Sequence, residues 1–140
     1  MTLLEMLVVV AIVGLIAAVS FPSFSTGLDS IRLQSAADSV ASFIDAAANR
    51  TERKQEIVEI VIDPKANRIL LFSTEPGFQK TLQMPRNISL AGDEEQRRVL
   101  MPGGALPRFS IDLVNAKGGR KRVTMDPITE TSSISIPGGP

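Results

Sequence analysis

The first 24 residues are almost continuously apolar, whereas polar and apolar positions alternate along the rest of the chain. Every residue from Met6 to Val19 is apolar or glycine, and residues 6–28 carry no charge. About 20 helical residues span roughly 30 Å, the thickness of a bilayer's hydrocarbon core. A buried core helix would not be apolar on every face in so small a domain. A cleaved secretion signal fits poorly, because no Lys or Arg precedes Arg32. Residues 1–24 are therefore predicted to form a transmembrane helix.

Three residues interrupt this helix. Glu5 places a carboxylate near the helix start, where it costs less than at the bilayer centre and where the helix dipole favours an anion. Glu5 is either an acid at the membrane interface or an acid that needs a cation inside an apolar assembly. The α-amine of Met1 in a neighbouring copy is such a cation. Pro22 removes a backbone hydrogen bond and so predicts a kink, and Gly14 adds a second weak point.

Residues 25–54 continue as an amphipathic helix, and strands follow from residue 56. Apolar residues recur at three- and four-residue steps in the helix: Ile31, Ala36, Val40, Phe43, Ile44 and Ala47. The charged run 51–56 is interpreted as a solvated helix end. Short runs rich in β-branched residues predict strands at 56–63, 68–73, 78–84, 87–91, 108–115, 120–127 and 132–137. Residues 92–98 are interpreted as a charged loop, and 99–101 are too short to assign.

The predicted fold is α+β, with a long helix over about residues 1–54, kinked near Pro22, packed on an antiparallel sheet of about seven strands. The predicted organisation is a hydrophobic segment at 1–24 and a polar head at 25–140. The head comprises the amphipathic helix 25–54 and a β-sheet over 56–137. We call residues 1–24 the stem and residues 25–140 the head.

Composition excludes several kinds of chemistry. The chain has no histidine and no cysteine, which removes disulfides, thiol catalysis, histidine metal sites and Ser-His triads. Lys plus Arg and Asp plus Glu both number 15, so net charge does not favour nucleic acid or anionic lipid. Glycine-rich phosphate loops do not occur. The three adjacent acids at 93–95 are interpreted as a solvated loop. We therefore expect no enzyme, no metal and no cofactor.

One basic cluster stands out, at residues 117–122. It contains Lys117, Arg120, Lys121 and Arg122 around the glycine pair 118–119. One interpretation is a hairpin turn that leads into an edge strand, where Lys and Arg resist edge-to-edge pairing. The other is a patch that grips the phosphates of a nucleic acid with little sequence preference.

The stem strongly resembles the N-terminal segment of mature type IV pilins and type II secretion pseudopilins. The match lies in TLLEMLVVVAIVGLIAAVSFPSF, where Thr2, Leu3, Glu5, Gly14 and Pro22 all fall at the family's positions. Met1 replaces the usual Phe, either as a natural variant or as a start codon in place of the leader and first residue. The head is similar to the GspH/FimT branch in its Ala/Arg-rich helix end and its final strands. In FimT-type members a Gly-Arg-x-Arg motif is associated with DNA uptake, and Gly119, Arg120 and Arg122 fit that spelling.

The resemblance implies a structural subunit and not a catalyst. Such subunits are processed by a prepilin peptidase, which leaves an N-terminus (here Met1) that is open to methylation. They wait in the bacterial inner membrane with the head in the periplasm, and then join other major and minor pseudopilins in a filament with their stems inward. Glu5 would pair with a neighbour's N-terminal amine, and residues 14–22 would let the stem bend.

Three functions follow as expectations. The leading one is a minor pseudopilin that supports protein secretion through a type II secretion or type IV pilus-like filament. The second is a FimT-like minor pilin that binds DNA through residues 117–122. The third is a membrane-anchored periplasmic domain that forms no filament.

Overall fold

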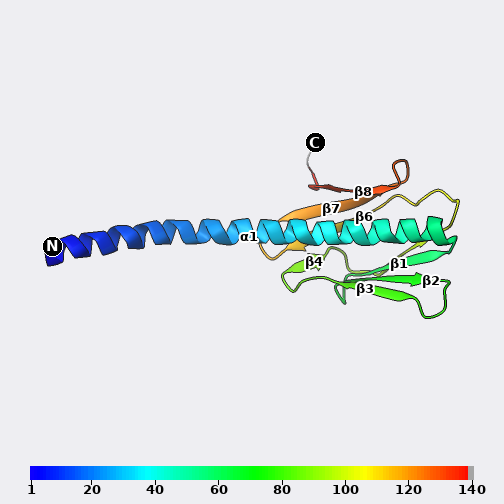
Figure 1. Cartoon of the computed structure of the whole chain (residues 1–140), viewed down its shortest axis with the longest axis horizontal. Helices are drawn as coiled ribbons and strands as arrows, with labels where there is room; N and C mark the ends of the chain where they lie inside the picture. The colour runs from blue at the N-terminus through cyan, green and yellow to red at the C-terminus, as the bar shows by residue number, and fades with distance from the viewer. Residues whose placement is uncertain (139–140) are drawn as a thin grey trace. The chain divides into compact units, whose positions relative to one another are not determined.

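The computed structural model describes the backbone of residues 1–138 and the side chains of residues 1–21 and 26–138 (Figure 1). Within this part the chain forms one long helix, α1 (Leu3–Lys54), followed by eight strands. The strands are β1 (Val58–Asp63), β2 (Arg68–Ser73), β3 (Gln79–Gln83), β4 (Ile88–Leu90), β5 (Gln96–Leu100), β6 (Phe109–Asn115), β7 (Arg120–Asp126) and β8 (Thr131–Ser135). The α+β class expected from the sequence is confirmed, with one more strand than expected.

Helix α1 ends where the sequence predicts. Arg53 and Lys54 lie in its last turn, where cations interact favourably with the helix dipole. Gln55 follows with a φ of 53°, the left-handed conformation that commonly closes a helix. The predicted kink at Pro22 falls on residues 22–25, whose side chains lie outside the described residues, so the kink stays a prediction.

The contacts divide the chain into two compact units, Met1–Arg32 and Leu33–Pro140. The first unit is the N-terminal part of α1 alone, and the second holds the rest of α1 with the strands. Ile31, which the sequence analysis placed in the buried stripe, belongs to the first unit and is 67% exposed. That assignment is wrong, and the buried stripe begins at Leu33.

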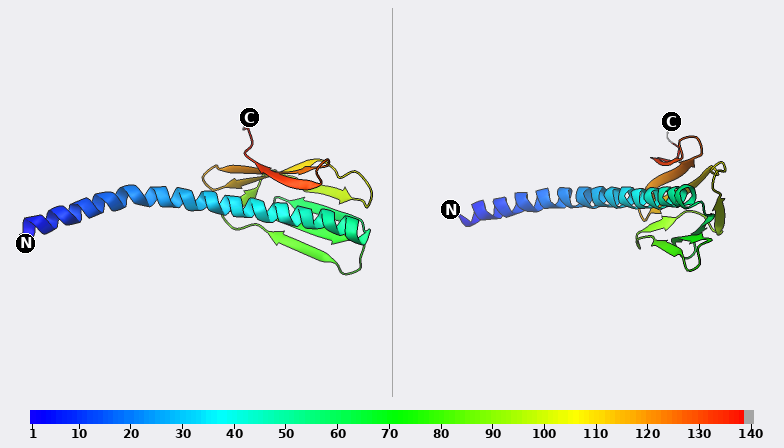
Figure 2. Two further views of the ribbon diagram at one scale, coloured as in Figure 1. Left: turned by 45° about the horizontal axis from the view of Figure 1, so that its top comes forward. Right: turned by 45° about the vertical axis from the view of Figure 1, so that its right-hand side comes forward.

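The strands form two four-stranded antiparallel sheets and not the single sheet expected. One has the order β3-β2-β1-β5 and the other the order β4-β6-β7-β8. In the views of Figure 2, β1–β3 and β6–β8 lie on opposite sides of the C-terminal part of α1. The expectation of one sheet failed because the residues of a strand indicate its two faces but not its neighbours.

Strand β5 lies where the sequence analysis expected a charged loop. It pairs with β1 from Val58↔Leu100 to Ile62↔Gln96. Because β5 is an edge strand, charged side chains are tolerated on its exposed face. Arg97 reaches Glu59 across the pair at 3.4 Å, whereas Leu100 on the other face is fully buried. The prediction of a loop over residues 92–98 is therefore wrong for residues 96–98, which belong to β5.

The core lies between α1 and both sheets. From α1 it receives a stripe of mostly small side chains: Leu33, Ala36, Ala37, Val40, Ile44, Ala47, Ala48 and Thr51. From the strands it receives residues that include Ile60, Leu100, Leu113, Val123 and Met125. The alanines allow the helix to approach the sheets closely. Burial of each larger aliphatic side chain stabilises the folded head by about 1.5–3 kcal/mol.

The side chain of Asn67 joins the two sheets. Asn67 lies in the β1–β2 turn with a φ of 54°. Its Nδ2 donates to the carbonyl of Ile88 at 2.8 Å, and its Oδ1 accepts from the amide of Leu90 at 2.9 Å. The amide group thus satisfies the backbone of β4 in the way a neighbouring strand would.

The last strand is tied to the helix. The amide of Ser132 donates to Oδ1 of Asp45 at 2.9 Å, and its hydroxyl donates to the carbonyl of Ala41 at 3.2 Å. These bonds join residues 87 and 91 positions apart. They fix β8 against α1 at the edge of its sheet.

Candidate functional site

The surface of the stem is apolar all round. Its large apolar side chains are exposed: Leu3 near its start is 85% exposed and Phe21 near its end is 81% exposed. The helix that carries them is long and apolar enough to cross a membrane. Exposure of such an apolar surface to water is unfavourable.

At the start of the stem, Thr2 and Glu5 bond reciprocally. The amide of Glu5 donates to Oγ1 of Thr2 at 3.3 Å, and the amide of Thr2 donates to Oε2 of Glu5 at 3.4 Å. This arrangement is a capping box, in which the side chains of Thr2 and Glu5 each accept from a helix-end amide. The amide of Glu5 also donates to the carbonyl of Thr2 at 3.1 Å. Sequence analysis overlooked it, although Thr-x-x-Glu at a helix start is its signature. Glu5 therefore has a partner within its own chain.

The other stem residues singled out from the sequence have less structural context. Met1 is 95% exposed. A Cβ added at Gly14 would meet no atom within 4 Å, so packing within the chain does not require a glycine there. Pro22 lies outside the described side chains.

The basic cluster begins in a tight turn between β6 and β7 that Asn115 organises. Oδ1 of Asn115 accepts from the amide of Lys117 at 3.1 Å and from that of Gly119 at 2.7 Å. Gly118 has a φ of +84°, which favours glycine. A Cβ on Gly119 would lie 2.8 Å from Nδ2 of Asn115. The turn itself therefore accounts for both glycines of the candidate motif.

Arg122 is engaged within the hairpin. It faces Asp112 on β6, and the two side chains form two hydrogen bonds, of 2.6 and 2.8 Å. The bond from Arg122, together with its charge and that of Arg120, holds the pKa of Asp112 below its ordinary value. The same pairing raises the pKa of Arg122. One of the four candidate phosphate contacts is thus already neutralised.

The remaining cations point in different directions. Side chains alternate along β7, and Val123 and Met125 are buried. Lys121 therefore shares the inward face with these residues and is partly buried, whereas Arg120 lies on the outward face and is exposed. Lys117 is exposed in the turn. The structure brings Lys117 and Arg120 to one exposed turn and separates Lys121 and Arg122 by face.

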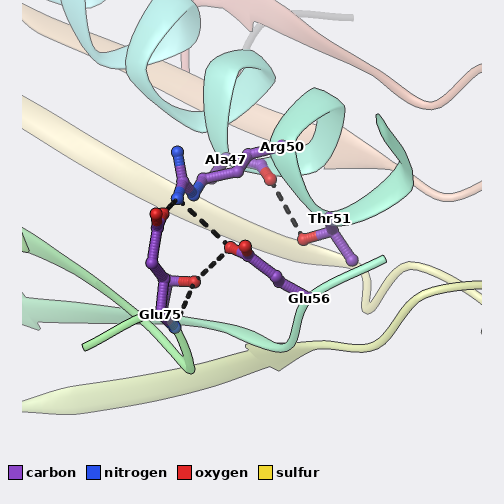
Figure 3. A network of polar contacts seen from close by, with 6 residues as sticks. Ala47, Arg50, Thr51, Glu56 and Glu75 are labelled. Carbon is purple, nitrogen blue, oxygen red and sulfur yellow. Dashed lines mark hydrogen bonds and ion pairs between the residues drawn. The ribbon is translucent and has the colours of Figure 1, made fainter. Parts of the chain in front are cut away.

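A polar network at the end of α1 was not anticipated from the sequence (Figure 3). Arg50 pairs with Glu75 and with Glu56 at 3.2 Å, and its guanidinium lies 3.6 Å from the centre of the Phe78 ring. The hydroxyl of Ser73 donates to Glu56 and, with the charges of Arg50 and Lys54, lowers the pKa of Glu56.

This network corrects one sequence interpretation. The run 51–56 was taken as solvated, but Thr51 is fully buried and donates to the carbonyl of Ala47 at 3.0 Å. Glu56 is bonded to Arg50 and Ser73. Within the run 51–56, only residues 52–55 are exposed. The network joins the helix end to the β2–β3 turn, which makes it a structural joint.

Comparison with known proteins adds no identification. No model of a protein family, no curated protein and no solved structure matches the chain. Within the described residues, no three Asp or Glu side chains are grouped so that they could hold a metal ion.

Proposed function

We propose that the chain is a membrane-anchored subunit of a type II secretion or type IV pilus-like filament, a minor pseudopilin in role. The observation that carries this proposal is the stem: a helix of membrane-spanning length, exposed and apolar on every side, with one carboxylate near its start. A plain anchor needs the apolar length but not the acid. An anchor that leaves the lipid for an assembly of stems can use the acid to select its neighbour.

In this proposal the stem serves two surroundings in turn. In the inner membrane, lipid covers the apolar side chains, and the head lies in the periplasm. In the filament, neighbouring pseudopilin stems replace the lipid, and Glu5 pairs with the α-amine of a neighbour's Met1. Because such a pair is shielded from water, removal of one partner is costly, by about 3–5 kcal/mol. Pairing in the wrong register leaves both charges alone, so the ion pair sets the stagger between stems.

The likeness of the stem to pilins and of the head to the GspH/FimT branch supports the secretion role. Processing by a prepilin peptidase and methylation of the N-terminus belong to the same proposal. Helical flexibility near Gly14 and Pro22 would help the stem leave the bilayer.

The test is the full-length Glu5→Ala chain, expressed in membranes with its companion subunits. We expect the variant to insert normally and to be lost from sheared filaments. Asp38→Ala is the matched control, because Asp38 is an exposed acid of α1 outside the stem whose partner is Gln34 at 3.0 Å. If Glu5→Ala enters filaments as well as the control does, Glu5 has no assembly role.

A second candidate function is DNA binding at the β6–β7 turn. The observation in its favour is that Lys117 and Arg120 are both exposed there. The engagement of Arg122 by Asp112 weakens it. Titration of the full chain in detergent with duplex DNA at several salt concentrations tests it, with Arg120→Ala against Lys80→Ala as a control on β3. Binding that is absent, or equal in the two variants, removes this candidate.

A further inference from the structure

The sheet β3-β2-β1-β5 has an apolar face on the side away from the core, which we call its outer face. Side chains alternate along β1, so Ile60 faces the core whereas Glu59 and Val61 belong to the outer face. Val61 is only 2% exposed, although it lies outside the core cluster. It is flanked in register by Leu70 of β2 and Arg97 of β5. The outer face therefore carries an apolar layer of its own.

The other sheet of the head shows the more common pattern, in which the face away from the core is polar. Along β6 and β7 the residues that alternate with the buried ones are mostly polar, and they include Ser110, Asp112, Arg122 and Thr124. The two sheets thus differ in the surface that they expose. An exposed apolar surface with polar groups at its rim is typical of an interaction site.

A cavity of about 290 Å³ opens on the apolar outer face. Its lining residues are Ile57, Glu59, Phe72, Ser73, Thr74 and Val99. Ile57 and Val99 are exposed although both are large and apolar. Glu59 contributes a carboxylate to this lining. The volume lies at the lower end of the range for ligand pockets, so it suits a single long side chain.

The charges on the outer face are not balanced. Arg97 lies 3.4 Å from Glu59 and 2.8 Å from Glu95, so one guanidinium is shared by two carboxylates. Asp63 and Arg68, at the other end of β1 and β2, form a neutral pair at 3.8 Å. One negative charge is left over among these five groups.

The polar network at the end of α1 does not supply the missing cation (Figure 3). Its carboxylates, Glu56 and Glu75, are balanced by Arg50 and by Lys54, whose charge acts on Glu56. The described charges around the cavity therefore favour a cationic occupant over a neutral or anionic one.

We propose that this cavity binds an arginine or lysine side chain of a partner protein. Both side chains join an apolar stem to a terminal cation, and they bury the stem along apolar surfaces. The stem lies against Phe72 and Val99, and the cation reaches Glu59. Arginine is favoured over lysine, because its guanidinium also stacks on an aromatic ring such as that of Phe72. The cavity belongs to the head alone, so this role does not depend on the filament function proposed above.

A short peptide with one arginine between two alanines tests the site, since the same peptide with citrulline keeps the shape and loses the charge. The full-length chain is held in an uncharged detergent, and its Ile, Leu and Val methyl groups are followed by NMR. We expect the arginine peptide to shift the methyl signals of Ile57 and Val99 until they saturate. The citrulline peptide should bind about tenfold more weakly, because the charge-assisted bond to Glu59 is lost.

Two variants of the chain assign this difference to the cavity. Glu59→Gln should bind the two peptides equally, because the carboxylate is replaced by an amide of the same shape. Asp63→Asn is the matched control, since Asp63 lies on the same face of β1 but outside the cavity. This variant should keep the preference for arginine.

Equal binding of the two peptides by the parent chain, or no saturable shift at Ile57 and Val99, overturns the inference. A preference for arginine that survives Glu59→Gln overturns it too, because the charge is then recognised elsewhere. If the same methyl signals shift with protein concentration in the absence of peptide, a second copy and not a basic side chain occupies the face. Each of these results leaves the filament function standing, because that function is tested at Glu5.

Discussion

At the scale of single residues, Glu5 has a second explanation beside assembly. The capping box gives its carboxylate a donor in its own chain and fixes the first helical turn. The two explanations are compatible, because the box requires an acceptor whereas the pairing with a neighbour requires a charge. A Gln side chain offers an acceptor but carries no charge. The Glu5→Gln variant therefore separates the capping role from the assembly role.

Thr2→Val should fray the start of the stem. The hydroxyl that accepts from the Glu5 amide is lost while the β-branched shape remains, and loss of such a cap costs about 0.5–2 kcal/mol. Hydrogen exchange in detergent micelles measures this as faster exchange of the Glu5 amide. Thr2→Ser should behave like the parent chain, and Glu5→Gln should keep most of the protection. Unchanged exchange in Thr2→Val would show that the box does not hold in the micelle.

Asn67→Ala should destabilise the head by about 1–3 kcal/mol, because a carbonyl and an amide of β4 lose their partner together. Urea unfolding of the full chain in detergent, followed by circular dichroism, measures the change. Asn49→Ala is the control: Asn49 also bonds to a backbone carbonyl, but on the exposed surface of α1. Equal losses in the two variants would mean that Asn67 does not join the sheets.

At the scale of elements, the hydrophobic pattern predicted the helix and most strands well. The bounds of α1 and the β1–β2 hairpin followed from local residues, since both are formed by neighbours in sequence. Strand β5 was missed because Arg97 and Arg98 disguise it, and its pairing with β1 depends on residues almost 40 positions away. The division into two sheets depends on such distant pairings. The bonds by which Asn67 joins the sheets are also distant, and no local pattern reveals them. The same limit applies to the candidate site: the cluster 117–122 was visible in the sequence, but the pairing of Arg122 with Asp112 was not.

The β6–β7 hairpin should owe part of its stability to the charge of Asp112. The pKa of Asp112 is lowered in the folded chain by its bond to Arg122. The stabilisation is therefore complete above the pKa of an unfolded Asp, about 3.9, and is lost as the pH falls through the lowered pKa of the folded chain. Unfolding curves of the parent chain and Asp112→Asn should therefore differ at neutral pH and converge in acid. The exposed Asp38→Asn variant should show no such convergence. A difference that persists below the lowered pKa would contradict the pairing.

At the scale of the whole molecule, the two units have different requirements. The core residues all lie between Leu33 and Met125, so the head does not need the stem for its hydrophobic core. The stem, by contrast, has large apolar side chains that are exposed to solvent within the described residues.

Residues 26–140 alone should accordingly fold and remain soluble without detergent. Thermal unfolding of this fragment should be cooperative, with a midpoint within a few degrees of the head in the full chain. Size-exclusion chromatography and circular dichroism provide the measurement. A fragment that is unfolded, or that aggregates at once, would show that residues 1–25 contribute to the fold of the head.

The bonds from Ser132 to Asp45 and Ala41 form late during biosynthesis, because Ser132 lies near the end of the chain. The strand that completes the second sheet emerges last, yet it docks on a helix made almost 90 residues earlier. Contacts so distant in sequence slow folding, because the chain must close a long loop before the contact contributes. Until then Asp45 and the carbonyl of Ala41 lack these two partners. Under the membrane anchorage proposed above, the stem would hold each head apart from other incompletely folded heads, which would limit aggregation until the last strand docks.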